Sequence, residues 1–101
     1  MNFKQWIAFL ESLKSEGLKV VRHPRFSNCY AEIYKYNFAT IQVFGRYLTD
    51  PAKIEQIFVQ IYFDNELRDR ESRTEKTFST NELDAVRQFI TEQKKKWKFH
   101  E

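Results

Sequence analysis

The stretch that decides the fold is Cys29–Tyr47, CYAEIYKYNFATIQVFGRY. Small or aliphatic residues take most of its odd positions, and aromatic or polar residues take the even ones. Successive side chains of a strand point to opposite faces, so the pattern predicts two strands, Cys29–Tyr36 and Phe38–Tyr47. Asn37 is the visible break between them, and we expect an antiparallel pair joined by a tight turn there.

Three further strands are expected around this pair. Leu18–His23 alternates and is stopped by Pro24, and Ile54–Phe63 is a third run rich in β-branched and aromatic residues. The charges of Asp64–Arg73 alternate in sign, which is typical of a solvated loop. Thr74–Phe78 then predicts a short last strand that pairs back on the preceding one.

A helix is predicted at the N-terminal end. Asn2 and Gln5 have the spacing of a reciprocal helix cap, and Gly17 supplies the backbone freedom that ends a helix. The apolar residues between them recur at helical spacing and form one stripe: Phe3, Trp6, Ile7, Leu10 and Leu13.

A second helix is predicted at the C-terminal end. Ser79-Thr80-Asn81-Glu82 has the pattern of a capping box, with Phe78 and Leu83 placed as a hydrophobic staple. The apolar stripe that follows comprises Leu83, Val86, Phe89, Ile90 and Trp97.

Together these elements predict a single α+β domain over residues 1–101: an N-terminal helix, an antiparallel meander of about five strands and a C-terminal helix. A chain of 101 residues with 42% hydrophobic residues can bury one core. The helices are expected on the aliphatic face of the sheet, which carries Cys29, Ala31, Ile33, Ala39, Ile41, Val43, Ile57, Val59, Ile61 and Phe63.

Composition narrows the class of protein. One cysteine excludes an intrachain disulfide and a zinc site built on several thiolates, so we expect a cytoplasmic protein. Charged residues interrupt the first helix, and neither a signal peptide nor a membrane span is predicted. The net charge of +3 permits a polyanionic partner without requiring one.

No catalytic constellation stands out, so we predict a protein that is not an enzyme. Cys29 and His23 flank the same turn and are the one conceivable nucleophile and base, but Cys29 belongs to the aliphatic set, where a buried thiol is the usual outcome. Two distant histidines and scattered carboxylates specify no metal site. Gly17 and Gly45 stand alone and form no phosphate loop, so no cofactor is expected.

The even positions of the strands predict an aromatic second face. An ordinary solvated face carries Lys, Glu and Thr, whereas this one carries large rings with Gln and Thr between them. The sequence leaves three possibilities for what covers this face: one of the chain's own helices, a protein partner or second copy, or nucleic acid. The rings expected to bind are Tyr30, Tyr34, Tyr36, Phe44, Phe58 and Tyr62.

Two groups of basic residues accompany this face. A rim is expected from Arg22, Arg25, Lys35 and Arg46, with His23, Arg73 and Lys76 nearby; it suits phosphate contacts, or ordinary solubility and protection of sheet edges. The second group is Lys94, Lys95, Lys96 and Lys98 around Trp97. These lysines complement the C-terminal end of the helix dipole, or contact a polyanion with Trp97 as an anchor.

The leading hypothesis from sequence is a small binding module that holds single-stranded or irregular nucleic acid on its aromatic face. The alternative is a protein-interaction module, either a homodimer or an accessory inhibitor of a nucleoprotein complex encoded by a mobile element. The order of elements is similar to that of the double-stranded-RNA-binding domain. However, the lysines of that domain stand at the start of its last helix, and here they stand at the far end, so we assign no family.

Overall fold

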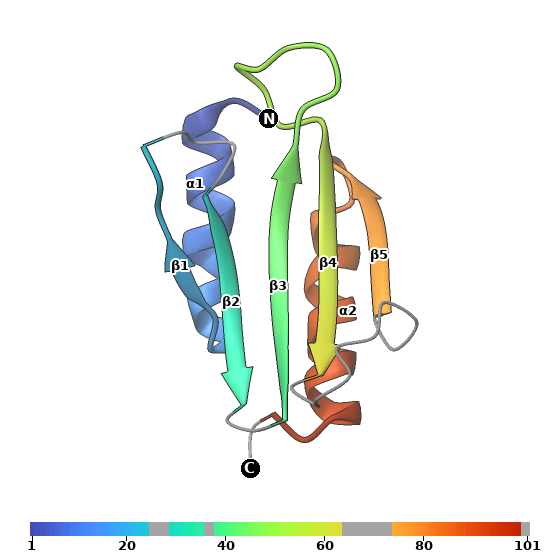
Figure 1. Ribbon diagram of the computed structural model, residues 1–101. Coiled ribbons are helices and arrows are strands. Elements are labelled where there is room, and N and C mark those ends of the chain that lie inside the picture. The colour runs from blue at the N-terminus through green and yellow to red at the C-terminus, as the bar shows by residue number, and fades with distance from the viewer. Residues whose placement is uncertain (25–28, 36–37, 64–73, 100–101) are drawn as a thin grey trace.

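The computed structural model describes residues 1–24, 29–35, 38–63 and 74–99. Helix, meander and helix follow one another in the predicted order (Figure 1). The elements are α1 (Phe3–Ser12), η1 (Leu13–Glu16), β1 (Lys19–Val21), β2 (Tyr30–Lys35), β3 (Ala39–Arg46), β4 (Gln56–Phe63), β5 (Thr74–Ser79) and α2 (Leu83–Lys96).

The predicted cap of α1 is confirmed. The side chain of Asn2 accepts a hydrogen bond from the Gln5 N–H (2.8 Å), and the Asn2 N–H donates to Gln5 Oε1 (2.9 Å). The chain then tightens into η1, a 3₁₀ helix, which ends at Gly17 with φ 89°. That left-handed conformation is the reason for glycine at this position.

The sheet is an antiparallel meander in the order β1-β2-β3-β4-β5, which confirms the predicted α+β fold. Each strand pairs with its neighbours in sequence. The register sets residues of equal parity side by side in β2, β3 and β4, whereas odd residues lie opposite even ones where β1 meets β2 and β4 meets β5. Ala31 lies opposite Val43, and Val43 lies opposite Val59. The aliphatic positions therefore form continuous rows across the sheet.

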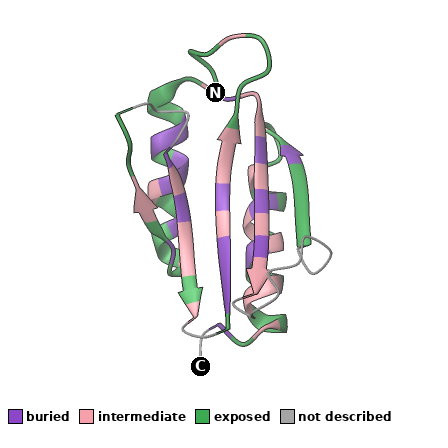
Figure 2. Ribbon diagram, viewed as in Figure 1, coloured by how far each residue is buried: buried purple, intermediate pink, exposed green. Residues whose placement is uncertain are grey.

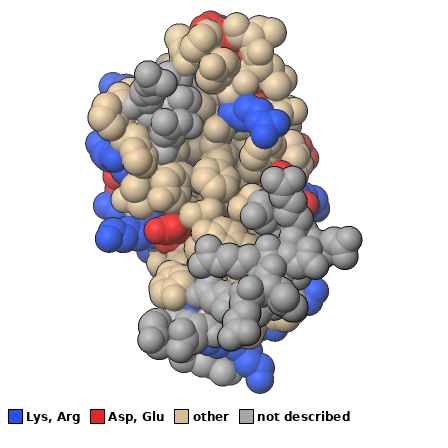
Figure 3. All heavy atoms as spheres, viewed as in Figure 1, with Lys and Arg blue, Asp and Glu red and all other residues tan. Residues whose placement is uncertain are grey.

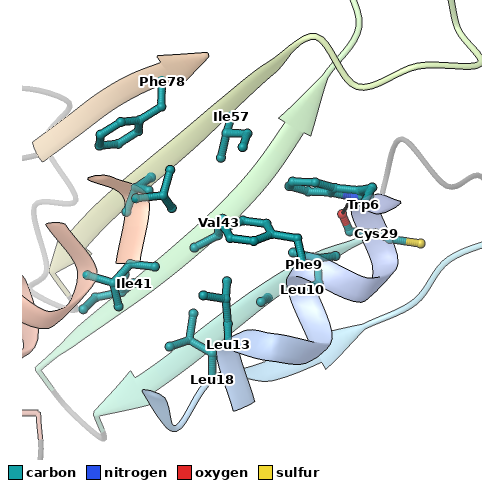
Figure 4. Packing of buried hydrophobic residues seen from close by; sticks show 14 of the residues in the cluster. Trp6, Phe9, Leu10, Leu13, Leu18, Cys29, Ile41, Val43, Ile57 and Phe78 are labelled. Carbon is teal, nitrogen blue, oxygen red and sulfur yellow. Dashed lines mark hydrogen bonds between the residues drawn. The ribbon is translucent and has the colours of Figure 1, made fainter. Parts of the chain in front are cut away.

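The core lies between this aliphatic face and the two helices (Figure 4). α1 and α2 both lie on the same side of the sheet, behind it in the view of Figure 1. Figure 2 shows buried residues alternating with less buried ones along β3 and β4, as expected of a sheet with one face in the core. Trp6 is fully buried, and its Nε1–H donates to the Cys29 carbonyl oxygen (3.2 Å), which ties α1 to the start of β2.

The start of α2 differs from the predicted capping box. The helix begins at Leu83 with Glu82 as N-cap, and the Glu82 side chain caps no helical N–H. One half of the predicted box is present, because Glu82 Oε1 accepts from the Ser79 N–H (2.8 Å) and from Ser79 Oγ (2.9 Å). The other half differs, because the Glu82 N–H donates to the Ser79 carbonyl (3.1 Å) and not to its side chain. The carboxylate thus closes the turn between β5 and α2. In the described part of the chain, no helix is both long enough and apolar enough to cross a membrane.

Candidate binding face

The face of the sheet opposite the helices carries side chains in rows that cross the strands. Phe44 lies opposite both Tyr30 on β2 and Phe58 on β4, so three rings from three strands stand side by side. We call Tyr30, Phe44 and Phe58 the aromatic row. Sequence parity predicted that these rings share a face, and the register shows in addition that they are direct neighbours.

Each end of the aromatic row has a nitrogen-bearing side chain against it. The His23 ring is stacked on Tyr30, with centroids 6.1 Å apart, and Tyr30 lies 5.6 Å from Phe44 in a tilted pair. Arg46 places its guanidinium carbon 4.0 Å from the Phe58 centroid. Burial raises the pKa of the Tyr30 phenol above its usual 10.0, and the charge of Glu32 raises it further.

A polar row of Glu32, Gln42 and Gln60 runs beside the aromatic row. Gln42 lies opposite Glu32 and Gln60, and its Nε2 donates to Glu32 Oε2 (3.0 Å). All three residues are partly buried. The row places a carboxylate and two amides in the middle of the face, with Lys19 on β1 and Glu75 on β5 at its two ends, and sequence reasoning did not single it out.

A third row consists of Tyr34, Thr40 and Tyr62. Tyr34 is 55% exposed, whereas Thr40 is buried at 4%. Tyr36, also expected on this face, lies outside the described residues. Of the six rings expected to bind, the five that the structure describes share this face, whereas Phe38, a seventh ring at an even position, does not.

Neither described helix covers this face, because α1 and α2 both pack on the aliphatic side. The sequence left open that one helix lies over the rings, and the arrangement of α1 and α2 excludes this. Figure 3 views the molecule from the open side, where charged groups are sparse among the described residues at the centre of the face.

Arg46 lies on the aromatic face, against Phe58. It is one of the four residues predicted to form the basic rim, which are Arg22, Arg25, Lys35 and Arg46. Arg22 forms an ion pair with Glu11 of α1 (2.8 Å), which directs its guanidinium toward the helix layer. Arg25 lies outside the described residues.

The expectation that Lys35 and Lys76 flank the aromatic face is wrong. Lys35 lies opposite the fully buried Ala39, and its Nζ donates to the Lys98 carbonyl (2.8 Å) at the end of α2. Lys76 Nζ lies 5.2 Å from the ring centroid of the buried Phe78. Both lysines therefore belong to the helix side of the sheet.

The C-terminal lysines lie on α2 and just beyond it, in the layer behind the sheet. Lys94 is held against η1, where its Nζ donates to the Glu16 carbonyl and lies 3.6 Å from Glu16 Oε2. Lys95, Lys96 and Lys98 are exposed, and Lys98 adopts a positive φ of 57° where the helix ends. This cluster is thus separate from the aromatic face.

Trp97 is not an outward-pointing anchor. Its ring lies 4.8 Å from Phe63 and 6.2 Å from Phe38, and its Nε1–H donates to Gln93 Oε1 (3.1 Å). Phe38, expected among the even-numbered rings of the open face, joins this cluster because it lies just before β3 begins. The cluster closes the end of the core.

Cys29 lies next to His23, but its thiol meets the backbone of His23 and not the imidazole. Cys29 Sγ lies 3.3 Å from the His23 N–H, which donates to it, and 3.5 Å from the His23 carbonyl oxygen. The imidazole itself stacks on Tyr30, and the thiol is 2% exposed. This arrangement gives the thiol no side-chain base from His23.

The turn between β3 and β4 exposes two apolar side chains that the sequence analysis did not select. Tyr47 and Leu48 are 44% and 59% exposed. The Glu55 carboxylate holds the turn by accepting hydrogen bonds from the Thr49 and Leu48 N–H groups, which keeps the pKa of Glu55 below its usual 4.5. The turn follows Arg46 at that end of β3.

A second surface feature is a groove of about 600 Å³ between α1 and α2. Arg87 lies in it, with its guanidinium carbon 5.2 Å from the Phe9 ring, and donates to Asp84 and Ser12. Its principal charged group is therefore already engaged within the chain.

Comparison with known proteins adds no relative from which a function could be transferred. No protein-family model, no curated protein and no solved structure matches this chain.

Proposed function

We propose that the chain is a non-enzymatic binding module whose aromatic sheet face contacts another protein. The observation that carries the proposal is the row of Tyr30, Phe44 and Phe58, in register on three strands and covered by neither described helix. Aromatic residues are enriched in protein interfaces, and each buried ring removes a large apolar area from water. The amides of Gln42 and Gln60, between the rings, supply hydrogen-bonding groups within the contact.

The distribution of charge favours a protein over nucleic acid. Arg46 is a cation on the face, whereas Arg22, Lys35 and Lys94 are bound to groups on the helix side. Beside the aromatic row, Glu32 and Glu75 add two negative charges and Lys19, opposite Glu32, adds one positive charge, so the net charge of that row is negative. Single-stranded nucleic acids are held by cations that follow the phosphates, and a carboxylate in the same place repels them.

Nucleic-acid binding is the second candidate. It is favoured by His23 against Tyr30 and by Arg46 against Phe58, because side chains at both ends of a row of rings can hold phosphates while bases stack between them. Binding of this kind must weaken as salt concentration rises.

A photo-crosslinking amino acid at Phe58 tests the proposal in the cells that make the protein. The matched control carries the same group at Lys95, which is exposed on the opposite layer. We expect adducts of protein mass from position 58 that are absent from position 95. A nuclease-sensitive adduct instead supports the second candidate, and the absence of any adduct specific to position 58 overturns the proposal.

A further inference from the structure

We infer that the protein bound by this face is a second copy of the chain, related to the first by a two-fold axis along the aromatic row. The inference rests on the proposed protein-binding function and names the partner. The positions of charged and exposed apolar residues on the two sides of the row carry it.

Symmetry leaves few ways to place the face against itself. The two-fold axis of a closed dimer that joins two identical faces must lie in the plane of the interface. An axis parallel to the strands and centred on β3 places Arg46 against the partner's Arg46, which juxtaposes two positive charges. An axis across the strands, along the aromatic row, instead exchanges the two ends of each strand.

The crossing axis brings opposite charges together. Arg46 lies two residues beyond Phe44 on β3, and Gln42 lies two residues before it, with Glu32 beside Gln42 in register. Rotation about the aromatic row therefore sets Arg46 over the partner's polar row, one strand away from the partner's Glu32. Facing sheets are about 10 Å apart and strands about 4.8 Å, a separation that Arg and Glu side chains approaching from both sides can bridge. The symmetry forms this pair twice.

The same rotation matches exposed apolar groups. Tyr34 lies four residues beyond Tyr30 on β2, and Leu48 lies four residues beyond Phe44 past the end of β3. They are among the most exposed large hydrophobic side chains described, at 55% and 59%, and they lie on opposite sides of the row. The crossing axis therefore places Tyr34 of one copy over the end of the partner that carries Leu48, and Leu48 over the end that carries Tyr34.

The packing is also compatible with sheet geometry. Rotation about an axis across the strands makes facing strands antiparallel, and aligned sheets pack with their strands within about 30° of each other. The row of Arg46 and Gln56 is the fourth on this face. Five strands about 4.8 Å apart and four rows about 7 Å apart give a face of roughly 600 Å² before the area of protruding side chains is added. That is comparable with the roughly 800 Å² per partner of a standard interface.

Sedimentation equilibrium of the purified full chain tests the inference, with Arg46→Glu and Glu32→Arg as variants. We expect the wild type to dimerise and each charge reversal to weaken the dimer by about tenfold or more, because each variant creates two like-charge pairs. A mixture of the two variants makes both pairs attractive again and must regain the dimer. Lys95→Glu, on the helix layer, is the control and leaves dimerisation unchanged. Circular dichroism checks that every variant is folded.

The outcomes separate this inference from the proposed function. A wild-type chain that stays monomeric up to about 0.5 mM overturns self-association, because a dimer weaker than that is of no consequence for binding. If position 58 still crosslinks to another protein in cells, the proposed function stands without it. A wild-type dimer that the mixture of variants fails to restore overturns the axis along the aromatic row.

Discussion

The guanidinium carbon of Arg46 lies 4.0 Å from the centroid of the Phe58 ring on the neighbouring strand. The register pairs Arg46 with Gln56 and Phe58 with Phe44, so the contact runs diagonally from β3 to β4. The exposed Arg46 side chain is thereby directed along the open face. The orientation of its charge is set by the chain itself before any partner arrives.

Replacing Arg46 with Gln should lower the free energy of unfolding by about 0.5–1 kcal/mol, the usual contribution of a cation over an exposed ring. Urea denaturation measures the change, and Lys95→Gln is the matched control on the helix layer. In a Phe58→Leu background the Arg46→Gln change should cost almost nothing, because the ring is gone. An equal cost in both backgrounds would contradict the stacking contact.

Gly45→Ala should destabilise the fold by about 1–3 kcal/mol through overpacking. A Cβ at Gly45 meets two Ile54 side-chain carbons at 2.8 Å and a Trp6 ring carbon at 3.0 Å, and both of those residues are fully buried. The midpoint of chemical denaturation reports the loss.

Ile54→Val provides the matched background for that measurement, because it removes the Cδ1 atom, one of the two that collide. The Gly45→Ala cost should be smaller in this background than in the wild type. Equal costs in both backgrounds would mean that Ile54 is not what restricts position 45.

The Cys29 thiol should react with a disulfide reagent at least about a hundredfold more slowly in the native protein than in the unfolded chain, because it is buried. His23→Ala should leave the native rate almost unchanged, since the thiol meets His23 through the His23 backbone N–H and carbonyl. A fast native reaction that slows in His23→Ala would instead support a catalytic pair.

Much of the fold follows from residue patterns. Alternation along Cys29–Tyr47 predicted two strands and their buried face, and Asn2 with Gln5 predicted the start of α1, as the structure confirms. Both patterns are local: one requires only neighbouring residues on a strand, the other a single helical turn. Register depends on the turns between strands, so the sequence did not show that Tyr30, Phe44 and Phe58 are direct neighbours.

The basic rim was predicted less well than the strands, although the alternation of side chains already argued against two of its lysines. Lys35 has the parity of Ile33, and Lys76 has the parity of Phe78, so the alternation rule itself places both on the helix side. Lys94 lies four residues beyond Ile90 on the buried stripe of α2. Its link to Glu16 depends on how α2 lies against η1, a tertiary contact that no local pattern encodes.

Glu55 should make stability depend on pH in the acid range. Backbone N–H groups of Thr49 and Leu48 hold its pKa below the usual 4.5, so its contribution is present above pH 4.5 and is lost as pH falls through the lowered folded value. Glu55→Gln should remove this part of the acid dependence in unfolding measured at several pH values. Thr49→Val removes the hydroxyl donor but keeps the backbone donors, so it should retain most of the effect. An unchanged acid dependence in Glu55→Gln would contradict the assignment.

Tyr30 should mark the open face through its titration. Burial is the largest cause of its raised pKa, followed by the charges of Glu32 and Tyr62. Because the folded value is the raised one, the contribution of Tyr30 to stability is complete below pH 10.0 and is lost as pH rises through the folded value. Absorbance titration of phenolate, with Tyr30→Phe to identify the signal, measures this pKa.

Glu32→Gln should lower the pKa of Tyr30 without returning it to 10.0, because burial persists when the charge is removed.

Occupation of the aromatic row should raise the pKa of Tyr30. A partner seated on Phe44 removes more water from the neighbouring phenol, so the pKa of Tyr30 should rise as the protein is concentrated into its dimer. A titration that is independent of concentration across the range in which the dimer forms would place the interface elsewhere. A phenol on the contacted row loses water when the dimer forms, and its pKa must then rise.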